Sequence, residues 1–120
     1  MSGASITAWA LVLAFPVLAG GCMSGQKRYM CLSRQAEAKA SLKSVHTAET
    51  AYKAGHAKFG SSLTEIGFTP ATARYYDVKI DSASDTAFSA TATGKDQSSG
   101  DVWSIDQTGT VVAKVDKCHE

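Results

Sequence analysis

The chain lacks both an excess of charge and the short motifs that mark common enzymes. Its 120 residues carry 12 basic and 11 acidic side chains, a formal net charge of +1. Binding of nucleic acid through overall charge is therefore not indicated. The sequence also has no metalloprotease, thiol-redox, serine-hydrolase, phosphate-loop or dinucleotide motif. These absences favour a protein that is not an enzyme and needs no cofactor.

Residues that commonly bind metals are few and scattered. The three histidines are His46, His56 and His119. The first two fall about 80° apart on a helix, so they do not share one metal-facing stripe. No metal site is predicted.

Charge is absent from the first 26 residues, where residues 6–18 are almost wholly apolar. This pattern indicates an export or membrane signal. A membrane-spanning helix needs about 20 apolar residues, and this run is shorter and contains Pro16. A cleaved signal peptide is the simpler interpretation.

The end of this segment, residues 17–22, resembles a bacterial lipobox, in which an aliphatic residue and two small residues precede a lipid-modified cysteine. The pattern predicts lipidation of Cys22, with residues 1–22 serving as signal or anchor. Ala19 stands where most lipoboxes have leucine, and Lys27 and Arg28 follow the apolar run instead of preceding it. An uncleaved anchor and a true start upstream of residue 1 are the alternatives.

Two further cysteines, Cys31 and Cys118, are predicted to form a disulfide in an oxidising compartment. The bond would close a loop of about 87 residues, for which chain entropy gives about 4 to 5 kcal/mol as an upper figure. Two free thiols, or another pairing among the three cysteines, are the alternatives.

Residues 31–60 form the predicted amphipathic helix, after a polar spacer at residues 23–30. The expected apolar stripe is Ala38, Leu42, Val45, Ala48, Tyr52, Gly55 and Phe59. The expected exposed face is Arg34, Glu37, Lys39, Lys43, Glu49 and Lys53. Gly60 is predicted to end the helix, and a capping box at residues 62–65 predicts a short turn over residues 62–67. So narrow a stripe needs a second layer to cover it.

Four short alternating runs supply that layer, at residues 74–80, 86–93, 102–105 and 110–116. The connections between them are of hairpin length, which predicts an antiparallel meander. The predicted fold is therefore α+β, a long helix packed on a four-stranded antiparallel sheet. Alternation places Tyr76 and Trp103 in the core and turns Tyr75 outward.

The basic residues concentrate in the helix and the acidic residues in the strands. Residues 27–60 contain seven basic and two acidic side chains, and residues 61–120 contain five and nine. Ordinary solvated charge is the simpler interpretation. The alternative is a cationic surface for anionic lipid or for an acidic neighbouring subunit. With Tyr75, Lys39 and Lys43 are the candidate surface contacts.

Five segments carry a resemblance to a known family: RQAEAKASLKSVHTAETAYKA (34–54), FGSSLTEIGFTP (59–70), ARYYDVKI (73–80), FSATATG (88–94) and DVWSIDQTG (101–109). In order and spacing the chain resembles the type IV pilins, most closely the short pilin-like subunits of deltaproteobacteria. The resemblance covers roughly two-thirds of the chain. It implies a pilin-like domain over residues 31–120.

The N-terminus departs from that family. A mature pilin begins with Phe-Thr-Leu-x-Glu, and its glutamate neutralises a neighbour's terminal amine during assembly. When Glu37 is set on the family's corresponding glutamate, Thr7 falls at the place of the assembly glutamate. We therefore expect a pilin-like domain on a lipoprotein anchor, at the periplasmic or cell-surface side of a Gram-negative envelope. A filament subunit of a pilus or pseudopilus, with a degenerate or mis-assigned N-terminus, is the alternative.

The expected partners follow from these two interpretations. The protein would be anchored to the membrane through its N-terminal lipid or apolar segment. Pilin or pseudopilin subunits would be the protein partners. Nucleic acid is not among the expected partners.

Overall fold

A computed structural model describes residues 19–69 and 75–119, with side chains from residue 25 onward. The chain divides into two compact units, Met1–Met30 and Cys31–Glu120. The side chain of Cys22, most of the predicted anchor at residues 1–22, and residue 74 at the start of the first predicted strand lie outside this description. The fold and sites below belong to the second unit.

Helix α1 covers Ala19–His56, so it begins before the predicted residue 31 and includes the predicted spacer. The reason is composition: between Gly25 and Cys31 the chain has good helix formers such as Gln26, Lys27 and Arg28, and no proline. The helix also ends before the predicted residue 60. Ala57 takes a left-handed conformation with φ 62°, and its amide donates to the Lys53 carbonyl at 2.8 Å. An αL residue closes a helix in this way.

Gly60 therefore does not end the helix, and its role is to leave space. A Cβ atom at this position would lie 2.5 Å from Cγ2 of Ile66. The turn predicted over residues 62–67 is present, with the Glu65 amide donating to Ser62 Oγ at 3.1 Å. Gly67 closes it at φ 73°.

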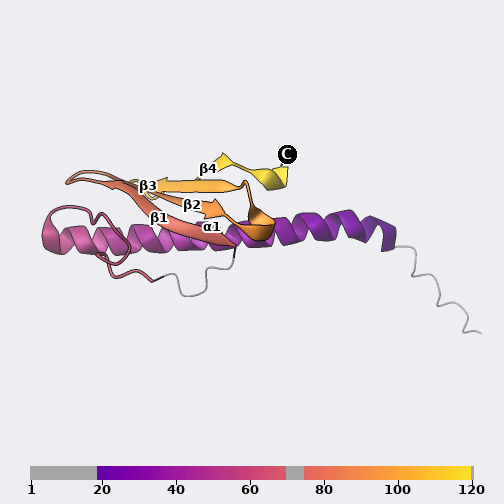
Figure 1. The fold of residues 1–120 in the computed structure, drawn as a ribbon, viewed down its shortest axis with the longest axis horizontal. Coiled ribbons are helices and arrows are strands. Elements are labelled where there is room, and N and C mark those ends of the chain that lie inside the picture. Colours follow the sequence, from indigo (N-terminus) through magenta and orange to yellow (C-terminus); the bar gives the residue numbers. More distant parts are fainter. Residues whose placement is uncertain (1–18, 70–74, 120) are drawn as a thin grey trace, which may run out of the picture. The chain divides into compact units, whose positions relative to one another are not determined.

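The four predicted strands form one antiparallel sheet (Figure 1). They are β1 Tyr76–Ala83, β2 Phe88–Gly94, β3 Val102–Asp106 and β4 Val112–Val115, in the spatial order β1-β2-β3-β4. The α+β prediction is thus confirmed. Strand β1 continues past the predicted end at Ile80 because a register shift between Ile80 and Ser82 lets pairing with β2 resume.

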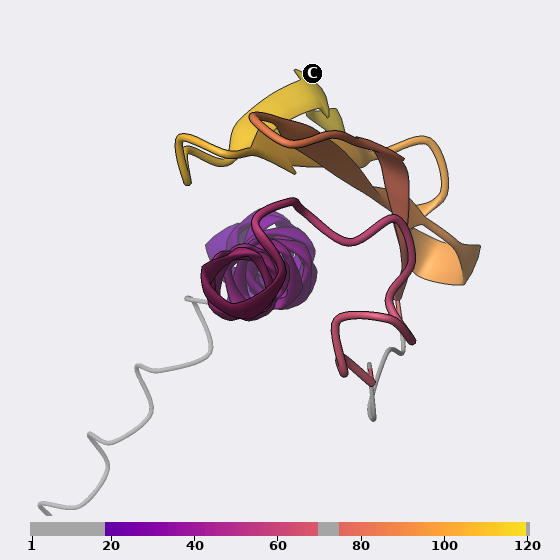
Figure 2. The ribbon, with the colours of Figure 1, turned by 90° about the vertical axis from the view of Figure 1, so that its left-hand side faces the viewer.

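The helix covers one face of the sheet, as Figure 2 shows in a view along α1. The buried apolar core consists of Ala38, Leu42, Val45, Tyr76, Phe88, Ala90, Ala92, Trp103 and Ile105. Ala90 and Ala92 of β2 and Ala38 of α1 are fully buried. Short side chains on both layers let the helix and sheet backbones approach closely.

The buried stripe of α1 differs from the predicted one at both ends. Gln35 is 1% exposed and Glu49 is fully buried, although Glu49 was placed on the exposed face and Gly55, in the predicted stripe, is exposed. From Ala38, Leu42 and Val45, continued steps of three and four residues lead to positions 35 and 49. Helix geometry, and not residue polarity, selects which side chains face the sheet.

Candidate functional site

A carboxylate, Asp101, lies buried between the sheet and the start of the second unit's helix, with 2% of its surface exposed. Asp101 immediately precedes β3 and lies two residues before Trp103. Its side chain therefore points to the same inward face of the sheet as that of Trp103. The loop that leads to it is held at both sides. The Gly94 amide donates to the Asp101 carbonyl at 2.7 Å, and the Asp101 amide donates to the Ser98 carbonyl at 3.0 Å. A Cβ on Gly94 would lie 1.8 Å from the Ser98 oxygen, so only glycine fits.

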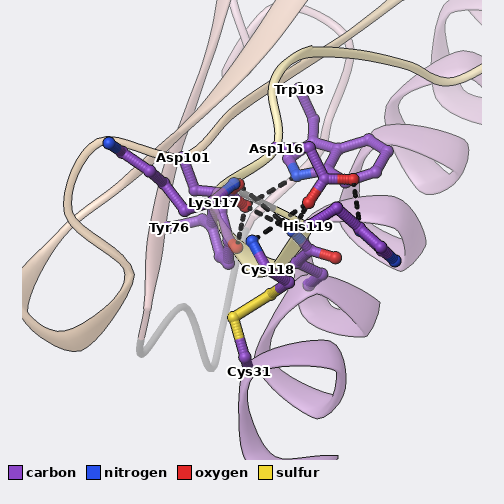
Figure 3. Close-up of a disulfide and its surroundings, with 9 residues drawn as sticks. Cys31, Tyr76, Asp101, Trp103, Asp116, Lys117, Cys118 and His119 are labelled. Atoms are coloured by element: carbon purple, nitrogen blue, oxygen red, sulfur yellow. Dashed lines mark hydrogen bonds and ion pairs between the residues drawn. A yellow bond between two sulfur atoms is a disulfide. The ribbon is translucent and has the colours of Figure 1, made fainter. Parts of the chain in front are cut away.

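Four donors converge on the Asp101 carboxylate, and Figure 3 shows Tyr76, Trp103 and Lys117 around it. Oδ2 accepts the Tyr76 hydroxyl at 2.5 Å and the Trp103 Nε1–H at 2.7 Å. Oδ1 accepts the Lys117 backbone amide at 2.9 Å and Gln35 Nε2 at 3.1 Å. The donors come from β1, β3, the C-terminal turn and α1. A buried charge is tolerated when it is compensated in this way.

Gln35 connects this carboxylate to a second one, Asp116. Its Nε2 donates to Asp116 Oδ1 at 2.8 Å. The same Asp116 oxygen accepts the Cys118 amide at 3.1 Å, and Oδ2 lies 2.8 Å from His119 Nδ1. We call Gln35, Tyr76, Asp101, Trp103 and Asp116 the Asp101 cluster. It joins the helix to the C-terminal turn η3, Lys117–His119.

The disulfide lies beside the Asp101 cluster. Cys31 is bonded to Cys118 with a Cα–Cα distance of 5.7 Å, within the range usual for disulfides. The predicted pairing is thus confirmed. One covalent bond and the polar contacts of η3 hold the same two segments together.

The Asp101 cluster also shifts the pKa values of Tyr76 and Asp116. Burial, helped by the hydrogen bond to Asp101, raises the pKa of Tyr76 well above its usual value. The hydrogen bond from Gln35 lowers the pKa of Asp116. At neutral pH Tyr76 therefore keeps its proton and donates it in the hydrogen bond to Asp101.

The groups of the Asp101 cluster are suited to holding the helix, the sheet and the C-terminal turn together. The Asp101 oxygens are saturated by donors, and neither an indole nor an amide N–H exchanges a proton as a general acid. In residues 19–69 and 75–119, no three His, Cys, Asp or Glu side chains gather closely enough to hold a metal ion.

A second buried carboxylate, Glu49, lies at the other end of the helix. Its Oε1 accepts the Gly60 amide at 2.6 Å, whereas Oε2 is buried without a hydrogen-bond partner among the described residues. Burial raises the pKa of Glu49, although the Gly60 hydrogen bond acts in the opposite direction. Nearby, Glu65 accepts the Ser61 amide at 2.6 Å and the Tyr52 hydroxyl at 3.1 Å. We call Glu49, Tyr52, Gly60, Ser61 and Glu65 the Glu49 corner.

The predicted surface residues have three different settings. Tyr75 is only half exposed, with the Arg34 guanidinium 5.7 Å from its ring centroid. Lys39 is exposed but holds its Nζ 4.8 Å from the Trp103 ring centroid. Lys43 is exposed on the helix. Their role as surface contacts stays a prediction.

Two further findings concern membrane-spanning helices and likeness to known proteins. No helix in the described ranges combines the length and apolar character needed to cross a bilayer. Comparison of the chain with protein-family models, curated proteins and solved structures found no significant match.

Proposed function

We propose that this chain is an exported structural protein of a Gram-negative cell envelope, without enzymatic activity. Its pilin-like domain, residues 31–120, is held at the membrane by the N-terminal segment. The observation that carries the proposal is the Cys31–Cys118 disulfide. Disulfides persist in oxidising compartments outside the cytoplasm, and the uncharged, apolar start of the sequence is of the kind that directs export.

The polar groups of the domain support a structural role. Asp101 accepts four hydrogen bonds within the fold, and Gln35 and Asp116 are engaged with it or with each other. These hydrogen bonds hold segments together, and the Asp101 oxygens that accept them are not free to act as a nucleophile or base toward a substrate. Contacts to other molecules fall to the surface, where Tyr75, Lys39 and Lys43 are the candidates.

Lipid on Cys22 is the form of anchor that we propose. Cys22, the last of the lipobox-like residues 17–22, lies nine residues before Cys31, so a lipid there would be attached close in sequence to the start of the second unit. A structural, adhesive or pilus-associated role outside the membrane would follow.

A filament subunit is the second candidate. The observation that favours it is the continuity of α1, a single helix of 38 residues with an ideal length of about 57 Å. A long helix that leads into the folded domain is suited to packing in a fibre core. The expected partners are then pilin or pseudopilin subunits.

Mass spectrometry of the native protein tests the anchor. We expect a mature chain that begins at a diacylglyceryl-modified Cys22, extracted from membranes by detergent. The Cys22→Ser variant, which keeps every side chain of the second unit, should lose the lipid and its membrane association. A mature chain that retains residues before Cys22 and is recovered in sheared filaments would overturn the lipoprotein proposal in favour of the filament subunit.

Thiol labelling tests export separately. In the unreduced native protein, neither Cys31 nor Cys118 should react with a maleimide, because the two form a disulfide outside the cytoplasm. Full labelling of both thiols in freshly isolated protein would contradict export into an oxidising compartment.

A further inference from the structure

We infer that strand β4 is an assembly edge, which pairs with strand β1 of a second copy of this chain. The inference adds a partner to the proposed function, and it concerns the domain surface and not the anchor. It rests on the strand order, on the side chains of the two edges and on their charges.

The strand order makes such pairing geometrically simple. The sheet has four antiparallel strands, with β1 and β4 at its edges. Because the number of strands is even, the two edge strands run in opposite directions. A second copy displaced sideways in the sheet plane would therefore bring its β1 antiparallel to β4 of the first.

Strand β4 has the features of an edge that accepts another strand. Val112 is 52% exposed and Val115 is 39% exposed, whereas Ala113 between them is packed against the core. Exposed apolar residues on an edge strand are a liability unless another strand covers them. A neighbouring strand would cover both valines.

Strand β1 offers the complementary edge. The Tyr76 amide donates to Glu37 Oε2 at 3.2 Å, so this amide points away from β2. Backbone groups at an edge alternate with a period of two, and Val78 and Ile80 should present their amides and carbonyls at the same open edge. Backbone groups at an open edge can form main-chain hydrogen bonds to β4 of another copy.

Charge favours pairing of β4 with β1 of the second copy over pairing of β4 with the second copy's own β4. Strand β4 carries Lys114, and β1 carries Asp77 and Asp81 with a single lysine, Lys79. Two β4 strands side by side would bring their Lys114 side chains near each other, and like charges across strands are destabilising. The existing pair between Lys95 and Asp77, at 3.2 Å, is largely exposed, so it contributes little and can exchange partners.

This pairing is head-to-tail, because different edges of the two copies meet. Contacts of this kind do not close after two subunits, and the rotation between successive copies determines whether they build a ring or an open array. Each copy would add four strands to a continuous sheet.

A photocrosslinking residue at position 79 tests the pairing in the full chain purified from membranes. Lys79 has an exposed side chain, and it lies on β1, so the probe leaves β4 unchanged. We expect crosslinked dimers and higher oligomers whose joined peptides contain residues 110–116 of another copy. Crosslinks to β1 of another copy, to a different protein only, or to nothing would overturn the inference.

The double variant Val112→Asp, Val115→Asp sharpens the test. Two added negative charges at the β4 edge would face Asp77 and Asp81 of β1 in the second copy, so the yield of the crosslinked dimer should fall at least tenfold. The double variant Ser44→Asp, Thr47→Asp is the matched control, since both residues are exposed on α1, belong to neither edge strand and should leave the yield unchanged. An unchanged yield in the β4 double variant, with circular dichroism and thiol protection like those of the parent chain, would also overturn the inference.

Failure of this inference and failure of the proposed function can be told apart. A lipidated chain without the crosslink would remove the β4–β1 pairing and leave the anchor in place. A chain without lipid that still gives the crosslink would do the reverse.

Discussion

A buried carboxylate lies near each end of the α1 segment in the second unit, and the two carboxylates accept different numbers of hydrogen bonds. At the start, Asp101 accepts four donors, and the Cys31–Cys118 disulfide lies beside it. At the end, Glu49 accepts the Gly60 amide, and its second oxygen is buried without a partner among the described residues. Equal burial therefore does not mean equal stabilisation.

The difference predicts where the domain opens first. A region with fewer hydrogen bonds to its buried carboxylate and no covalent tie has the lower free energy of local unfolding. The Glu49 corner is such a region, because Tyr52 and Phe59 are only half buried there. The Asp101 cluster should stay closed until the whole domain unfolds.

Removal of the disulfide should have the largest effect on this comparison. The Cys31→Ser, Cys118→Ser variant should lose about 4 kcal/mol of unfolding free energy, because the unfolded chain gains the freedom of an 87-residue loop. Urea denaturation of the oxidised parent and the double variant measures the loss. Equal midpoints for the two proteins would show that the covalent tie is not what distinguishes the two ends.

Asp101→Ala should have the next largest effect. The substitution leaves the Tyr76 hydroxyl, the Trp103 indole N–H and other buried donors without an acceptor, at a cost of about 3 kcal/mol. Asp85→Ala is the control, because Asp85 is exposed and should change stability by less than about 0.5 kcal/mol. A similar small change for both variants in urea denaturation would contradict the role of the Asp101 cluster.

Glu49→Gln tests the weaker end. Burial raises the pKa of Glu49 from 4.5. The folded protein therefore loses stability as the pH rises from about that value through the folded-state pKa of Glu49. A neutral amide keeps an acceptor for Gly60 and should gain about 1 kcal/mol at pH 7. Glu49→Ala should instead lose about 1 kcal/mol, because the Gly60 amide loses its acceptor. Unfolding curves between pH 4 and pH 8 measure these changes, and a parent chain more stable than Glu49→Gln throughout would refute the account.

Asp116 should give the smallest effect, at acidic pH. The hydrogen bond from Gln35 lowers its pKa below 3.8, so its contribution is present above pH 3.8 and is lost as the pH falls through the folded-state pKa. Asp116→Asn should reduce the loss of unfolding free energy at acidic pH, the acid limb of the stability curve, by less than about 1 kcal/mol. Thermal unfolding between pH 2 and pH 5 provides the measurement, with Asp85→Asn as the exposed control. An acid limb in Asp116→Asn as steep as that of the parent would exclude this source.

Much of the fold could be predicted because it depends on local patterns. Alternation in the strands placed Tyr76 and Trp103 in the core, and both are buried. The number of cysteines suggested the Cys31–Cys118 pair. Hairpin-length connections led to the antiparallel strand order.

The Asp101 cluster was missed because its members meet only in the folded chain. Gln35 and Asp101 are 66 residues apart, and no local pattern brings them together. A signal for burial was nevertheless present. Asp101 continues the two-residue step of Trp103 and Ile105, and Gln35 and Glu49 continue the three- and four-residue steps of the apolar stripe. Polarity concealed positions that geometry assigns to the interior.

The disulfide also has a mechanical consequence. Cys31 and Cys118 enclose all four strands and most of the α1 segment that packs on them. A pull on the chain from outside these two residues would travel through the sulfur atoms and bypass the enclosed segment. Under tension the strands would bear no load, and the domain would act as an inextensible link.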